Sequence, residues 1–590
     1  MSVLAVLLLA VSDLPAQAIV EDNREVKISV RFPWSELSGS RDGYSPVYVT
    51  IDNKRDRRGR WYLRSSSGYQ QPLESVFALD VPSTSRRSFE LLVPYEQVNH
   101  SLRLQLTLLG DGLDQPWHHY FSHHSSGSIL VGLSAELNAV VGVRLGEALG
   151  TSRGGRGQLA ALRPSDLPED WRAYLAFDRI WFSASDWAAL TSSRREALLN
   201  WVMQGGHLRL LAQPADGIEA SFRGVPAGAE RRPYGLGVFE VFSQSLESAA
   251  EPLVKDNGRH FRPGEETFFG YRHQFPALET ITKNEDAHPT FRGAGVAVMT
   301  SEESAEHKDW FSYQLEAPQV NFPLLIVSVT AFGIIVGPVN FFLFAKGRRR
   351  WRVFLTIPGI SLAFTAVLLL IILLSEGLGG RGYLSRMVVL DPERNLRLTV
   401  QDDLSRTGVL MGQTFTLPRQ AAYRSEGVAL TGGKLRDIAG PRQIRDGVTY
   451  SGGFFASRRL QHNRMTHLAS SREVMIRESG ATGATLRSNL QAGLGRTFFV
   501  DEAGDFWTAE RVGVGRRAKL QRSSRAEFAE WWSTACRRGG FALEAGPPAP
   551  RPGWFYAEAE PLPEALLEPL GGIRWYHFQT LIAGPVQPAS

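Results

Sequence analysis

The chain has 590 residues, which is too many for a single hydrophobic core and predicts several domains. Its 65 basic residues face 60 acidic ones, and a net charge of +5 excludes the strongly basic balance typical of nucleic-acid-binding proteins. We therefore expect no nucleic-acid partner. The single cysteine, Cys536, excludes an intramolecular disulfide and any zinc or iron–sulfur site built from cysteines.

Residues 1–18 are typical of a secretory signal peptide. The apolar run up to Val11 is too short to span a bilayer, and Ala16-Gln17-Ala18 matches the small-residue cleavage pattern. No basic residue precedes the apolar run, which departs from the usual signal. The alternative is a buried N-terminal strand or helix.

Residues 22–110 predict a β-sandwich. The segments 26–32, 47–51, 88–93 and 102–108 alternate apolar and polar residues with period two, and turn residues separate them. Several short strands of this kind within about 90 residues favour two packed sheets.

Residues 128–245 alternate strands with helices, which predicts a mostly parallel sheet covered by helices. We expect Thr191 to cap the second helix and Gly205-Gly206 to end it. The expected strands are 128–133, 158–162, 177–182 and 207–211, and the expected helices are 135–149 and 190–202.

Two runs in this segment carry a family resemblance. Residues 167–182, from Leu-Pro-Glu-Asp-Trp to Arg-Ile-Trp-Phe, and residues 189–206 resemble the class I glutamine-amidotransferase-like domain. The likeness covers about 85 residues and is greatest to the degenerate version found in uncharacterised bacterial membrane proteins. In those proteins, too, a sandwich precedes the domain and a Gly-Pro-Val-Asn motif, here 337–340, lies in a membrane span. The resemblance implies a flavodoxin-like α/β fold.

The resemblance also implies where a nucleophile would stand. Active members place a cysteine in the turn after the strand that corresponds to 207–211, but residues 212–217 read Ala-Gln-Pro-Ala-Asp-Gly. This chain therefore lacks the nucleophile of the family at that position. We expect no enzyme activity, no catalytic residues and no cofactor.

The segment 320–376 predicts a transmembrane hairpin. Residues 323–345 and 353–375 are each free of charged side chains and long enough to cross about 30 Å of hydrocarbon. Residues 346–352 carry five cations, which indicates a cytoplasmic turn and places both flanking regions outside. The alternative is a pair of buried core helices. We expect localisation in the bacterial inner membrane, with the lipid bilayer as one partner.

The remaining segments are less regular. The stretch from Tyr234 to Phe242 suggests a glycine turn and a further strand at the end of the α/β segment. Residues 246–319, which follow it, are expected to be an irregular connection. Residues 377–590 predict a second exported region that is mainly β, with a helix at 525–538. The fold class is thus multidomain α/β plus β: a sandwich, an amidotransferase-like domain, a two-helix hairpin and a C-terminal β region.

One histidine cluster has spacing suited to a metal. His118, His119, His123 and His124 could hold zinc or copper on a surface loop, but a polar linker between sandwich and α/β domain is favoured and no metal site is assigned. Four aspartates of the α/β segment are expected to cap helices and form turns rather than act as acids or bases, namely Asp166, Asp170, Asp178 and Asp186.

Three hypotheses for the function remain open. The favoured one is a non-enzymatic, membrane-anchored envelope protein whose outer domains bind or scaffold an envelope protein partner. The first alternative is an auxiliary subunit of an ABC-type export or gliding-like complex, which requires a partner with spans of its own. The second is a cryptic hydrolase with a polar pocket at the carboxyl ends of the parallel strands. The sequence leaves the oligomeric state open.

Overall fold

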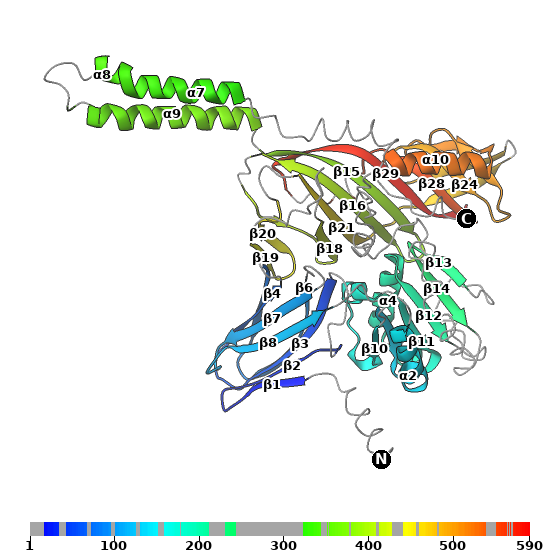
Figure 1. Ribbon diagram of the computed structural model, residues 1–590. Coiled ribbons are helices and arrows are strands. Elements are labelled where there is room, and N and C mark those ends of the chain that lie inside the picture. Colours follow the sequence, from blue (N-terminus) through cyan, green and yellow to red (C-terminus); the bar gives the residue numbers. More distant parts are fainter. Residues whose placement is uncertain are drawn as a thin grey trace.

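The computed structural model shows a mainly β molecule with several sheets, a few helices and one projecting pair of helices (Figure 1). The structure describes residues 17–34, 43–67, 72–95, 101–124, 130–151, 158–177, 179–211, 231–242, 322–343, 351, 353–376, 379–408, 412–426, 441–455, 460–480, 483–538, 550–562, 565, 567 and 570–589.

The N-terminal sandwich consists of two antiparallel sheets around one apolar core. Strict alternation of buried and accessible residues along β4 and β5 faces one side of each strand inward, as the period-two pattern predicts. Val26, Ile51 and Trp61 are fully buried between the sheets. The first sheet contains β1 (Gln17–Asp22), β2 (Val26–Arg31), β3 (Gly43–Asn53) and β6 (Ser85–Tyr95); the second contains β4 (Gly59–Ser67), β5 (Leu73–Val81), β7 (Ser101–Gly110) and β8 (Trp117–His124).

Strands from far along the chain complete the second sheet. Residues 442–445 of β19 pair in parallel with residues 73–76 of β5, so segments on either side of the projecting helices share one sheet. The Asp446 carboxylate accepts a hydrogen bond from the backbone N–H of Ala78 at 3.0 Å. The three added strands are β17 (Phe415–Thr416), β19 (Arg442–Arg445) and β20 (Thr449–Gly452).

A six-stranded sheet with order β10-β9-β11-β12-β14-β13 follows the sandwich, and only β13 is antiparallel. Helix α2 packs Leu137, Val141 and Leu145 on one face, and α4 packs Leu198 and Trp201 on the other. The elements are β9 (Leu130–Ser134), α2 (Ala135–Thr151), β10 (Gln158–Leu162), η1 (Pro164–Asp166), η2 (Trp171–Ala176), β11 (Arg179–Ser183), α3 (Ala184–Ala188), α4 (Ser192–Met203), β12 (His207–Leu211), β13 (Arg231–Tyr234) and β14 (Gly237–Phe242).

The C-terminal region forms a larger, curved sheet of twelve strands with α10 packed on it. Phe528 and Trp532 of α10 lie against Tyr556 of the sheet. The elements are β15 (Gly380–Asp391), β16 (Leu396–Thr407), β18 (Ala421–Glu426), β21 (Leu460–Ser470), β22 (Met475–Gly480), β23 (Gly483–Ser488), β24 (Leu494–Val500), β25 (Phe506–Ala509), β26 (Arg517–Lys519), β27 (Gln521–Arg522), α10 (Arg525–Arg538), β28 (Trp554–Ala559) and β29 (Ile573–Pro588).

Two apolar helices project from this body at the left of Figure 1. The first comprises α7 (Phe322–Ile334), a π-helical turn η5 (Ile335–Val339) that contains Pro338, and α8 (Asn340–Leu343). The second, α9 (Val353–Glu376), measures about 36 Å. In the most apolar 18-residue stretch of each helix, only 6% of the residues in the first helix and 0% in the second are buried. The alternative of buried core helices is therefore wrong.

Several expected limits differ from the observed elements. The sandwich extends past residue 110 to the end of β8, and it incorporates β17, β19 and β20 from the region expected to be separate. The polar linker expected at the histidines is therefore a strand. By contrast, Thr191 caps α4 as predicted, because its side chain accepts from the N–H of Arg194. The signal peptide up to residue 16, the connection 246–319 and the turn 346–350 lie outside the described residues.

Candidate functional site

The parallel sheet has one place where the chain reverses its direction of travel across the strands. From β9 the chain crosses to β10 at one edge and then returns past β9 to β11. In parallel sheets, ligands bind outside the carboxyl ends of the strands at such a reversal. The residues that end β9 and β11 are therefore the first candidates for a site.

A group of polar side chains occupies this reversal point. Ser134 ends β9 and Ser183 ends β11, and the Ser183 N–H donates to the Ser134 hydroxyl at 3.1 Å. Ser185 donates to the Glu136 carboxylate, and its hydroxyl lies 3.1 Å from that of Ser183. Hydrogen bonds from the Ser183 and Ser185 side chains lower the pKa of Glu136. Asp186 completes the group by accepting from the N–H of Glu136 at 2.8 Å.

The hydrogen bonds in this group are those of helix caps. Asp186 satisfies a backbone N–H in the first turn of α2, and Ser183 accepts from the N–H of Asp186 at the start of α3. Because its pKa is lowered, Glu136 stays ionised at neutral pH and is poorly suited to donate a proton. Among the described side chains that hydrogen-bond to one another here, there is no histidine, lysine or cysteine to act as a base or nucleophile.

Charged residues also lie within the same sheet. Glu240 on β14 contacts His207 Nε2 at 3.0 Å and Arg209 at 2.7 Å, both on β12. Burial alone would raise the pKa of Glu240, but His207 and Arg209 outweigh it and hold the pKa at about 2. Arg209 also stacks over Trp181. The three side chains satisfy one another, as buried polar and charged groups require.

The C-terminal sheet contains a second buried polar array. Gln401 on β16 donates to Asp403 at 3.0 Å and to the backbone oxygen of Leu567 at 2.7 Å, and it accepts from the Leu567 N–H. Arg386, fully buried on the neighbouring β15, donates to the backbone oxygen of Leu562 at 2.7 Å. Burial lowers the pKa of Arg386 to about 10. The array therefore fastens Leu562 and Leu567 to the sheet.

Asp402 lies between Gln401 and Asp403 on β16, so its side chain points to the opposite face of the sheet. Asp402 receives two hydrogen bonds from Arg464 on β21, at 2.7 and 3.0 Å. Both side chains are less than a tenth exposed. A bidentate pair of this kind orders two adjacent strands, and it leaves neither group available to a ligand.

The parts before and after the helix pair meet at a junction of buried side chains. Arg172 of η2 pairs with Asp170, donates to the backbone oxygen of Ala421 on β18 at 3.1 Å, and lies over the ring of Tyr44 on β3. Arg551 donates to the backbone oxygen of Gly235 at 2.9 Å, and burial lowers its pKa to about 9. Sandwich, parallel sheet and C-terminal sheet are thus bound into one body.

The structure places His118 and His119, two of the four candidate metal ligands, on opposite faces of one strand. Consecutive residues of β8 face opposite sides, so His118 and His119 point apart. His119 packs against Phe32 and Phe121, and the hydroxyl of Thr107 lies 3.0 Å from His118 Nδ1. The expected surface loop is therefore wrong. The side chains of His123 and His124 lie outside the described residues. Among the described residues no group of metal-binding side chains occurs.

The aspartates mostly play the roles expected from sequence. Asp170 caps η2 through the N–H of Arg172, and Asp186 caps α2. Asp166 differs, because it forms an ion pair with Arg31 of the sandwich. Asp178 and the turn 212–217, where an amidotransferase nucleophile would stand, lie outside the described residues. Sequence reasoning did not single out Ser134, Glu136 or Ser183, although their position after two parallel strands was a usable signal.

Comparisons with known proteins add little. No family model and no curated protein matches the sequence. Among solved structures, a calcium-binding mutant of Bacteroides uniformis beta-glucuronidase 2 is 11% identical, with a TM-score of 0.14 over 34% of this chain and 24% of that one. A putative beta-galactosidase from Bacteroides fragilis is 8% identical, with a TM-score of 0.16 over 34% and 38%. This chain thus spans less than two fifths of either structure, and scores this low carry no argument.

Proposed function

We propose that this chain is a non-enzymatic, membrane-anchored envelope protein whose large outer body binds or scaffolds a partner. The observation that carries the proposal is a pair of apolar, uncovered helices attached to a body built from both halves of the chain. Apolar side chains such as Phe354 and Leu362 are 83% and 74% exposed, an arrangement that is unfavourable in water and favourable in hydrocarbon.

The shared sheet supports the proposed topology. Because β5 precedes the helix pair and β19 follows it, the two can pair only when both lie on the same side of the membrane. A hairpin that crosses twice meets this requirement, whereas a single crossing does not. The arginine-rich turn at 346–352 supports a cytoplasmic position for the closed end of the hairpin. The strand pairing and the arginine-rich turn are observations from different parts of the chain.

The roles of the described polar side chains fit a binding function. The side chains at the reversal point of the parallel sheet cap helices, and the buried charges of the C-terminal sheet satisfy one another. The resemblance to degenerate amidotransferase-like domains and the strand order β10-β9-β11-β12-β14, which is that of flavodoxin-like folds, fit a domain retained for its shape.

Impermeant maleimide labelling tests the topology. In a Cys536→Ser background, Ser83→Cys lies before the helices and Arg516→Cys after them, and both positions are exposed. Both should react in intact spheroplasts, whereas Gly347→Cys should react only after permeabilisation. Labelling of Ser83→Cys and Arg516→Cys from opposite sides would contradict the proposal. So would recovery of the unlabelled chain in the soluble fraction without detergent.

The auxiliary-subunit alternative has one observation in its favour. A Cβ atom added at Gly333 or Gly337 of the first helix would meet nothing within 4 Å, so a glycine face stands open to another helix. Purification in mild detergent separates the two functions. Co-purification of a multi-span membrane protein with an ATPase supports the subunit, and a chain that purifies without them supports the scaffold.

A further inference from the structure

One end of the sandwich points away from the rest of the body. It is formed by the turns between β1 and β2, β3 and β4, β5 and β6, and β7 and β8, which we call the free end. The opposite end contacts the parallel sheet, for example through the ion pair of Arg31 with Asp166. In Figure 1 the free end and the helix pair both project to the left.

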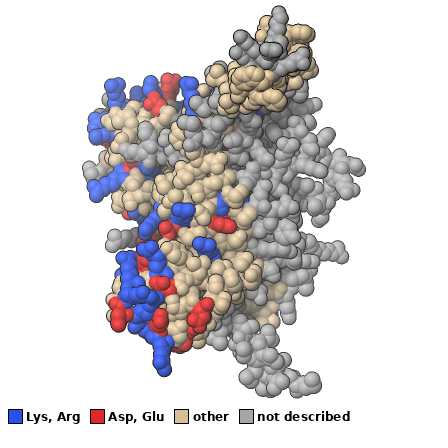
Figure 2. Space-filling model, turned by 90° about the vertical axis from the view of Figure 1, so that its left-hand side faces the viewer, with Lys and Arg blue, Asp and Glu red and all other residues tan. Residues whose placement is uncertain are grey.

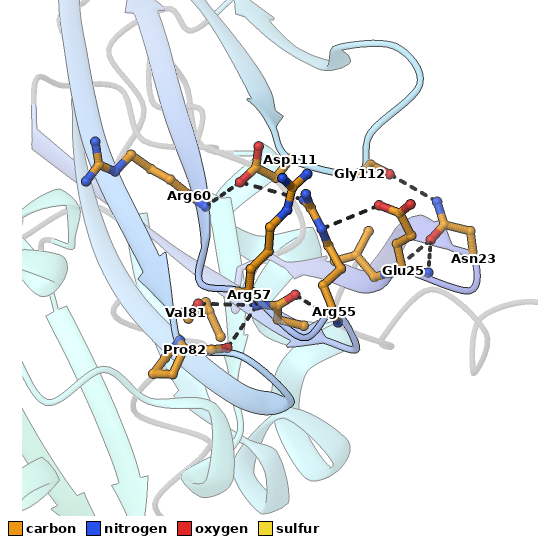
Figure 3. Close-up of polar contacts among 11 residues, drawn as sticks. Asn23, Glu25, Arg55, Arg57, Arg60, Val81, Pro82, Asp111 and Gly112 are labelled. Carbon is orange, nitrogen blue, oxygen red and sulfur yellow. Dashed lines mark hydrogen bonds and ion pairs between the residues drawn. The ribbon is translucent and has the colours of Figure 1, made fainter.

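Hydrogen bonds tie the turns of the free end into a rigid platform (Figure 3). The Asn53 amide is fully buried and donates to the backbone oxygens of Arg57, Val81 and Pro82 at 2.9, 3.3 and 2.9 Å. Asn23 donates to the backbone oxygen of Gly112 at 3.0 Å. The backbone positions of these turns are therefore fixed by the fold.

The free end presents a dense set of cations. Two of its acidic side chains each contact two cations: Asp22 contacts Lys27 and Lys54, and Asp80 contacts Arg58 and Arg60. Among the exposed side chains of the four turns and the strand ends beside them, eight are basic and four are acidic, namely Asp22, Glu25, Asp56 and Asp114. The exposed cations are Arg24, Lys27, Lys54, Arg57, Arg58, Arg60, Arg86 and Arg87. Figure 2 shows such basic side chains gathered in the lower part of the face seen from the helix side.

We propose that the free end rests on the anionic headgroups of the same bilayer that the helix pair enters. The proposal rests on the proposed function, since it requires the helices to lie in a membrane. Charge complementarity favours this occupant: cations at an anionic lipid surface are attracted within a Debye length of about 8 Å at physiological salt. With the helix pair as one attachment and the free end as another, the body would be held in one orientation over the membrane.

The test uses the full chain in lipid nanodiscs. A fluorophore is placed at Ser83→Cys, in the exposed turn between β5 and β6, in a Cys536→Ser background. Discs of phosphatidylcholine alone are compared with discs containing one-third phosphatidylglycerol, each with a small fraction of lipid that carries a nitroxide quencher on its headgroup. We expect strong quenching only in the anionic discs, and loss of quenching at 1 M salt, where the Debye length is about 3 Å.

Charge reversals distinguish this contact from general attraction. Arg24→Glu with Arg57→Glu removes two exposed cations that form no ion pair with any residue the structure describes, and should reduce quenching about tenfold. Arg516→Glu with Lys519→Glu makes the same charge change at β26, in the orange region at the right of Figure 1, and should leave quenching unchanged. Equal quenching in both lipids, or equal loss in both variants, would overturn the proposal. A chain that never enters the discs would overturn the proposed function as well.

Discussion

Arg172 is the side chain whose removal should loosen the body most selectively. Substitution by Met keeps the apolar stem and removes three interactions: the pair with Asp170, the hydrogen bond to the Ala421 oxygen and the contact with the Tyr44 ring. Breaking a buried pair from one side costs about 3–5 kcal/mol. Asp170 keeps a quarter of its side chain exposed and can rehydrate, so we expect the lower limit, about 3 kcal/mol.

Hydrogen exchange in detergent measures this loss where it arises. A local loss of about 3 kcal/mol accelerates exchange of the β18 amides about 100-fold in Arg172→Met. The matched control is Arg511→Met, which removes an ion pair with Glu560 whose two side chains are 72% and 55% exposed. Such a pair contributes at most about 1 kcal/mol, and β18 should not respond. Similar exchange of β18 in both variants would refute a junction held by Arg172.

Three further predictions follow from local environments. The pKa of Glu240, held at about 2, lies below its value in the unfolded chain. Its contribution to the free energy of unfolding, about 3 kcal/mol, is therefore present above pH 4.5 and lost as the pH falls towards 2. Glu240→Gln should flatten this part of an acid-unfolding curve. Gly237→Ala should lower stability by about 2 kcal/mol or more, because its Cβ would lie 2.2 Å from two backbone oxygens, while Gly412→Ala, with nothing within 4 Å, should be neutral in thermal unfolding. His119→Ala should destabilise the sandwich by about 1–3 kcal/mol and His118→Ala by less than about 1 kcal/mol in the same assay, and equal effects would contradict their opposite faces.

The candidate polar site was only partly predictable. Capping roles for Asp170 and Asp186 follow from their positions before helical segments, since an aspartate there accepts from free backbone N–H groups. The contacts of His207 and Arg209 with Glu240 were not predictable. Arg209 and Glu240 lie 31 positions apart, and their strands β12 and β14 had to be placed side by side first. For the histidines, spacing along the chain suggested a cluster, and the pleat of β8 separated His118 from His119.

The sequence by itself determined the features that depend on neighbouring residues. Uncharged stretches longer than a bilayer core marked the two helices, period-two alternation marked the sandwich strands, and a threonine before an amphipathic run marked the start of α4. Only the tertiary structure decided that β19 joins β5, a pairing whose Asp446–Ala78 hydrogen bond links residues 368 apart. Local patterns specify which backbone can form a strand, but the partner of an edge strand depends on which distant surfaces the whole chain brings together.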